Sequence, residues 1–76
     1  MREKKLLRDA ILDKEVEVIK VTCNDNIKRR ILDLGIIEGT IIKPVFRSPL
    51  GDPTAYEIRG TIIALREEET SNIEVQ

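Results

Sequence analysis

Hydrophobic positions in the second half of the chain fall into two runs, residues 40–46 and residues 56–65. The segment between them, residues 48–53, reads SPLGDP and contains two prolines and a glycine. Proline and glycine interrupt strands and favour turns. The two runs therefore predict an antiparallel hairpin with a shaped tip.

A second break occurs inside the later run, at Gly60-Thr61. Glycine at the first central position suits a two-residue type II′ turn, which joins neighbouring antiparallel strands. The later run thus divides into a strand over residues 56–59 and another over residues 62–65. The pattern predicts three consecutive antiparallel strands.

Two further strands are predicted at residues 16–21 and 73–75, where apolar and polar residues alternate. The first of these loses its alternation at Ile19, which indicates a β-bulge or a strand end buried on both faces. Ahead of it, residues 1–13 carry apolar side chains at a spacing typical of a short amphipathic helix. The many basic residues of this segment are equally compatible with a frayed terminus.

One helix is predicted after the first strand, with Asp25 as its N-cap. Apolar residues then repeat at helical spacing, and the basic residues between them favour a solvated outer face. Glycines mark the helix end and the later turns. The apolar positions are Ile27, Ile31 and Leu34, the basic ones are Lys28, Arg29 and Arg30, and the turn glycines are Gly35, Gly39 (with positive φ) and Gly60.

Five short strands and one helix in 76 residues predict a mostly β fold, a small and partly open β-barrel that forms a single domain over residues 1–76. Hydrophobic residues make up 41% of the chain and charged residues 36%, which favours a folded domain over disorder. There is no run of about 18 apolar residues and no signal-peptide pattern, so the sequence predicts a cytoplasmic protein that does not insert into a membrane.

The composition restricts the chemistry. Without histidine, and with Cys23 as the one cysteine, the chain lacks the residues of a Ser/His/Asp or Cys/His site and of the usual zinc cages. No phosphate-binding glycine loop is present. The acidic run at residues 67–69 is expected to be solvated. We therefore expect no enzyme activity, no cofactor and no metal site.

The balance of charge and aromatic residues also bears on partners. The formal net charge is −1, and Phe46 and Tyr56 are the two aromatic residues. Binding of single-stranded nucleic acid favours a basic groove with aromatic platforms, so nucleic acid is not expected as a partner. What remains is a module that binds another protein.

The hairpin tip is the predicted contact surface. Asp52 is expected to cap nearby amides in an Asx turn, or alternatively to touch the partner. The arginines beside the hairpins are expected to pair with acidic residues across the sheet, or alternatively to meet a partner's carboxylate or phosphate. The candidate partner-binding residues are Arg47, Pro49, Leu50, Gly51, Asp52, Pro53 and Arg66.

Several segments together resemble the FeoA family, the small bacterial accessory proteins of the Feo ferrous-iron transport system. The resemblance extends over roughly residues 14–75. It rests on RILDLGIIEGT at residues 30–40, SPLGDP at 48–53, RG at 59–60, ALR at 64–66 and IEV at 73–75. The related domain at the C-terminus of DtxR-type iron-dependent repressors follows a winged helix with metal ligands, which this chain lacks, so the free-standing form is expected.

The resemblance implies an SH3-like β-barrel and a partner, the FeoB membrane transporter with its cytosolic G-protein domain. It implies a non-enzymatic protein that docks on that domain and modulates it, and Arg47 or Arg66 is a candidate arginine finger toward bound GTP. The alternatives are a metal-responsive domain with weak transition-metal binding, as in the repressors, and a regulatory SH3-like domain unrelated to iron.

Overall fold

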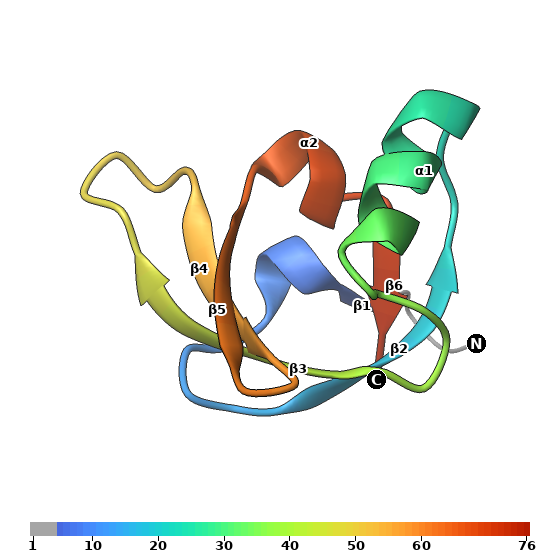
Figure 1. Cartoon of the computed structure of the whole chain (residues 1–76). Coiled ribbons are helices and arrows are strands. Elements are labelled where there is room, and N and C mark those ends of the chain that lie inside the picture. The colour runs from blue at the N-terminus through green and yellow to red at the C-terminus, as the bar shows by residue number, and fades with distance from the viewer. Residues whose placement is uncertain (1–4) are drawn as a thin grey trace.

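The computed structural model describes residues 5–76 and is a β-barrel with two short helices above it (Figure 1). Six strands form one sheet in the order β1-β6-β2-β3-β4-β5, and every pairing is antiparallel. The predicted mostly β class is confirmed, with six strands where five were expected. The elements are β1 (Lys5–Leu6), η1 (Leu7–Asp9), β2 (Val16–Val21), α1 (Asp25–Asp33), β3 (Ile41–Arg47), β4 (Thr54–Ile58), β5 (Thr61–Leu65), α2 (Glu67–Thr70) and β6 (Ile73–Val75).

The core consists of branched aliphatic side chains from almost every element. Among residues 5–76, ten hydrophobic residues are buried, and Tyr56 is the one aromatic residue among them. Alternation along β4 places Thr54, Tyr56 and Ile58 inside, which is the period expected for a sheet with one solvated face. The core members are Leu7, Val18, Ile31, Ile36, Ile42, Tyr56, Ile58, Leu65, Ile73 and Val75.

The β-bulge predicted in the strand over residues 16–21 is present in β2. The pairing of β2 with β6 shifts register between Val18 and Lys20, on either side of Ile19. A second shift interrupts the pairing of β3 with β4 between Pro44 and Phe46. Pro44 has no amide hydrogen to donate, so a bulge beside it is expected. These shifts bend the strands and so let the sheet curl into a partly open barrel.

The prediction of a short amphipathic helix in residues 1–13 is wrong over the part of that segment that the structure describes. Residues 1–4 lie outside the part that the structure describes, whereas β1 pairs with β6 and η1 forms one 3-10 turn. Leu7 is fully buried, but Ile11 is 63% exposed, so the two do not share a buried helical face. A helix as short as the predicted one would gain little stability from its own hydrogen bonds. Pairing of β1 with β6 stabilises the segment instead.

The N-cap of α1 lies one residue earlier than the predicted cap, Asp25. Asn24 is the N-cap, and its Oδ1 accepts a hydrogen bond from the amide of Ile27 at 3.1 Å. At the other end, the amides of Gly35 and Ile36 donate to the carbonyls of Leu32 and Ile31, which is a Schellman motif. Gly35 has φ +86°, which the motif requires at this position.

The turn between β4 and β5 also differs from its prediction. The two loop residues are Arg59 and Gly60, and both have positive φ, +52° and +83°. Positive φ at both central positions defines a type I′ turn, so the predicted type II′ turn at Gly60-Thr61 is wrong by one residue. Type I′ matches the twist of the flanking strands, which explains why Arg59 accepts a left-handed conformation.

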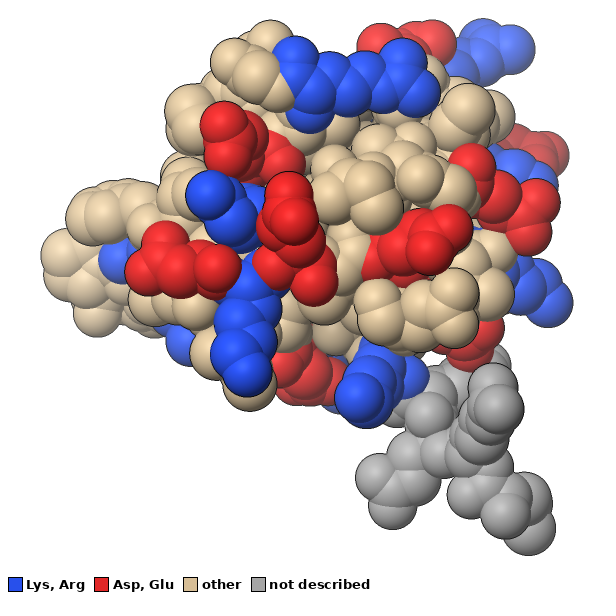
Figure 2. Space-filling model, turned by 90° about the horizontal axis from the view of Figure 1, so that it is seen from below, with Lys and Arg blue, Asp and Glu red and all other residues tan. Residues whose placement is uncertain are grey.

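Charged side chains of both signs are interspersed on the face seen from below (Figure 2). Lys43 and Glu57, cross-strand neighbours on β3 and β4, form an ion pair of 3.4 Å. The helices of residues 5–76 are all too short and too polar to span a bilayer.

Candidate docking site

The tip between β3 and β4 is a turn closed by backbone hydrogen bonds. The amide of Gly51 donates to the carbonyl of Ser48 at 2.8 Å, and the amide of Ser48 donates to the carbonyl of Pro53 at 3.2 Å. Proline at the second position and glycine at the fourth are the residues that a type I turn favours. The peptide bond between Asp52 and Pro53 is cis.

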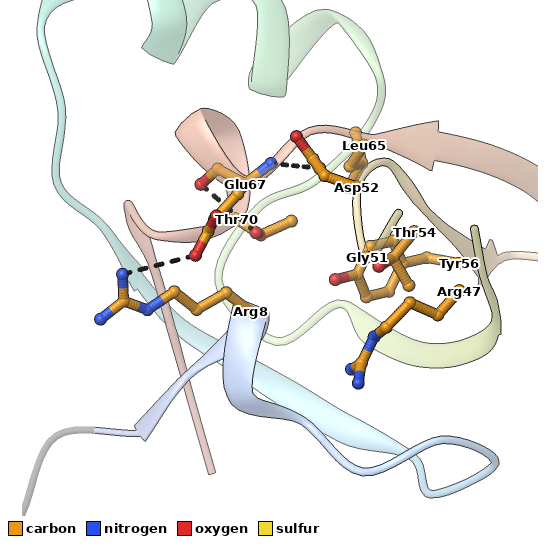
Figure 3. A pocket seen from close by; sticks show the side chains of 9 residues that line it. All are labelled: Arg8, Arg47, Gly51, Asp52, Thr54, Tyr56, Leu65, Glu67 and Thr70. Carbon is orange, nitrogen blue, oxygen red and sulfur yellow. Dashed lines mark hydrogen bonds and ion pairs between the residues drawn. The ribbon is translucent and has the colours of Figure 1, made fainter. Parts of the chain in front are cut away.

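Asp52 anchors this tip to α2. Its Oδ1 accepts a hydrogen bond of 2.9 Å from the amide of Glu67, the first residue of α2 (Figure 3). The predicted Asx turn is therefore replaced by a bond to a residue 15 positions away. A carboxylate beside unpaired amides at a helix start is favourable. The tip and α2 are thus held together although the chain between them makes two strands.

Leu50 occupies the apex of the tip and is 94% exposed. It follows Pro49, whose fixed φ limits how far the turn can rearrange. An apolar side chain this exposed gains nothing for the fold, and covering it by another molecule would be favourable. Leu50 is the most exposed large hydrophobic residue among residues 5–76.

The predicted site residues do not all face the same space. Arg47, Gly51 and Asp52 line a cleft of about 280 Å³ between the tip and α2 (Figure 3). Arg66 lines an adjoining, more open hollow on the other side of Asp52. None of the ion pairs within residues 5–76 involves Arg47 or Arg66, so the predicted pairing across the sheet is not formed.

The cleft between the tip and α2 is lined mostly by polar and charged residues. Its other lining residues come from η1, β4, β5 and α2. Burial raises the pKa of the Tyr56 hydroxyl above its ordinary value of 10.0, an effect opposed by Thr70, Thr54 and the positive charge of Arg47. Tyr56 is therefore protonated at neutral pH. Besides Arg47, Gly51 and Asp52, the residues that line the cleft are Arg8, Thr54, Tyr56, Leu65, Glu67 and Thr70.

Arg8 closes one side of the cleft, which the sequence did not indicate. Its guanidinium lies 3.8 Å from the Glu67 carboxylate and 3.7 Å from that of Asp9. All three side chains are largely exposed, so these pairs add little stability. Arg8 reaches this position because pairing of β1 with β6 places η1 beside α2.

The side chain of Glu69 is buried, so the prediction of a solvated acidic run is wrong at this position. Its Oε1 accepts a hydrogen bond of 3.0 Å from the amide of Arg66, and its Oε2 lies 2.7 Å from Nε of Arg30 on α1. The second contact lacks hydrogen-bond geometry and acts as a charge pair. Glutamate three residues after an N-cap is typical of a capping box, and Glu69 stands at that position. The pattern was not recognised because the cap residue is Arg66 and not serine or threonine.

Comparison with known proteins assigns the family. The family model described as "FeoA domain" matches residues 5–76. The chain belongs to the FeoA family. The resemblance drawn from its sequence is confirmed, and the match includes the β1 and η1 segment that the resemblance left out.

A curated relative from Porphyromonas gingivalis, a fusion of Fe(2+) transport protein A with the Fe(2+) transporter FeoB, is 34% identical over 59 residues. The alignment spans 78% of this FeoA chain but 7% of that much longer protein. A solved FeoA-like protein from Clostridium acetobutylicum is 33% identical, with a TM-score of 0.90, and covers 100% of this chain and 88% of its own.

A second solved relative is FeoA from Stenotrophomonas maltophilia, complexed with zinc and described as an SH3 domain protein. It is 29% identical, with a TM-score of 0.81, over 95% of this chain and 89% of its own. The SH3-like fold is thereby confirmed. A manganese-dependent transcriptional repressor shares the fold at 14% identity, with a TM-score of 0.84 over 95% of this chain and 40% of its own.

Proposed function

We propose that this FeoA chain is a non-enzymatic accessory protein of ferrous iron transport that acts in the cytoplasm. It docks on the cytosolic G-protein domain of a FeoB-like transporter and changes the activity of that domain. The support is the curated relative in which transport protein A and FeoB are one polypeptide. Fusion of two chains holds them at a high effective concentration, which is useful when they work in contact.

The contact surface in this proposal is the tip, with Pro49, Leu50 and Pro53 against the partner and Arg47 beside them. The observation that carries it is the exposure of Leu50 on a turn that Asp52 fixes to α2. A side chain carried on a hydrogen-bonded turn costs less backbone entropy to dock than one on a mobile loop, so more of the free energy of burial is retained. Arg47 and Arg66, which have no acidic partner within residues 5–76, remain available for a carboxylate or for the phosphates of bound GTP.

Replacing Leu50 tests the surface. Leu50→Glu is expected to weaken binding to the isolated G-protein domain by about 10-fold or more, because a charge would have to be desolvated where an apolar group was buried. Isothermal titration calorimetry measures the change. The matched control is Ile11→Glu, because Ile11 is 63% exposed and lies outside the tip. Equal affinities for the two variants would remove the tip from the proposal.

The metal-responsive alternative makes a different prediction. Within the described residues, no three Asp, Glu, Cys or His side chains gather into a possible metal site. We therefore expect anoxic titration with Fe²⁺ or Mn²⁺ to give no saturable one-to-one binding, because an oxygen-ligand site needs several converging carboxylates. Tight stoichiometric binding would favour the metal-responsive alternative over the docking role.

A further inference from the structure

Strand β5 is an open edge of the sheet. It pairs with β4 alone, and the backbone groups of residues 61–65 make no hydrogen bond outside that ladder within the described chain. Antiparallel residues alternate between bonding to their neighbour and pointing away from it. Counted from the two-residue turn, the N–H and C=O groups of Thr61, Ile63 and Leu65 face β4. Those of Ile62 and Ala64 face outward.

This edge lacks the features that usually prevent strand pairing. Its sequence, TIIAL, contains no charge and no proline, whereas the opposite edge β1 has two residues, of which Lys5 is charged. Natural sheets protect free edges with lysine, proline or a covering element. Ile62 is 58% exposed on this unprotected strand. A free row of donors and acceptors beside apolar side chains is what an added strand requires.

We propose that β5 is a dimerisation edge, pairing antiparallel with β5 of a second copy of this chain about a two-fold axis at Ile63. In this register, Ile62 of each copy lies opposite Ala64 of the other. The outward backbone groups of both residues then form four hydrogen bonds across the axis. The two Ile63 side chains, each half-buried in one copy, meet at the centre.

Charges at the two ends of the edge favour a second copy over an unrelated strand. The same register places the turn that contains Arg59 at the end of the edge where α2 of the other copy begins with Glu67. Both side chains are exposed and of opposite sign, and the symmetry forms the contact twice. Arg66 comes opposite Gly60, which has no side chain to oppose it. The edge is therefore complementary to itself in hydrogen bonding and charge.

Sedimentation velocity of the full chain over a concentration series tests this proposal. The interface is small, so we expect a monomer–dimer equilibrium in the micromolar to millimolar range. Ile62→Lys should raise the dissociation constant by about 10-fold or more, because it places two charges beside the shared edge. Ile41→Lys is the matched control: Ile41 is 48% exposed and lies on β3, which is paired on both sides. Its equilibrium should match that of the unmodified chain.

A charge exchange adds a test that does not depend on Ile62. Arg59→Glu alone should weaken the dimer, and adding Glu67→Arg should restore it, because the pair is re-formed with its signs reversed. A chain that stays monomeric at millimolar concentration overturns the proposal. So does a dimer that Ile41→Lys disrupts as much as Ile62→Lys does, or a charge exchange that restores nothing.

Discussion

Ile31→Ala is expected to lower the free energy of unfolding by about 2–5 kcal/mol. Ile31 is the one fully buried residue of α1, so its side chain carries most of the packing between that helix and the barrel. Alanine would leave a cavity that the surrounding strands cannot fill. In a domain this small, the loss is a large part of the total stability.

Urea denaturation followed by far-ultraviolet circular dichroism measures that loss. The control is Leu32→Ala, one position along the same helix, where the side chain is 46% exposed. This control should cost well under half as much, because much of the leucine surface already faces water. If the two variants unfold at the same urea concentration, α1 is not held to the barrel through Ile31.

Glu69→Ala is expected to lower the free energy of unfolding by about 1–3 kcal/mol. The substitution removes the acceptor for the Arg66 amide and the carboxylate that faces Arg30, and so separates α2 from α1. A part-buried amide left without an acceptor keeps its full desolvation cost. Thermal unfolding in low and high salt measures the effect, which should persist in salt because the carboxylate is buried.

Glu68→Ala is the matched control for Glu69. Glu68 has the same charge and lies in the same turn of α2, but its side chain is exposed and forms none of the ion pairs or side-chain hydrogen bonds of the described residues. Its replacement should change stability by less than about 0.5 kcal/mol. Equal effects at the two positions would mean that the burial and contacts of Glu69 add nothing to the effect of its charge.

Sequence periodicity predicted the barrel because it reflects local preferences. The alternation in residues 16–21 and 73–75, and the proline and glycine of the tip, specify strands and turns whatever surrounds them. The predictions failed where contacts between distant parts of the chain determine the local structure. Leu7 and Ile11 are spaced as in a helix, but β6 offers an open edge, and pairing of Lys5–Leu6 with it prevails. The type I′ turn moved by one residue because pairing of Ile58 with Thr61 sets the register.

The candidate site was predictable in part for the same reason. The tip sequence marks its own turn, so the turn at Pro49, Leu50 and Gly51 was predictable from the sequence. The contacts that hold the tip were not, because the bond from Glu67 to Asp52 joins residues that no local pattern relates. Arg8 and Glu69 reach the site region through η1 and α2, whose places depend on pairing of β1 with β6 and on contacts between distant elements.

Hydrogen exchange of this chain, alone and bound to the G-protein domain of a FeoB-like transporter, tests the docking claim most directly. The account predicts slower exchange of amides in residues 48–53 on binding, with no comparable change in β2 or β6 on the far side of the barrel. Unchanged exchange at the tip in a saturated complex, or slowing confined to other elements, would contradict it.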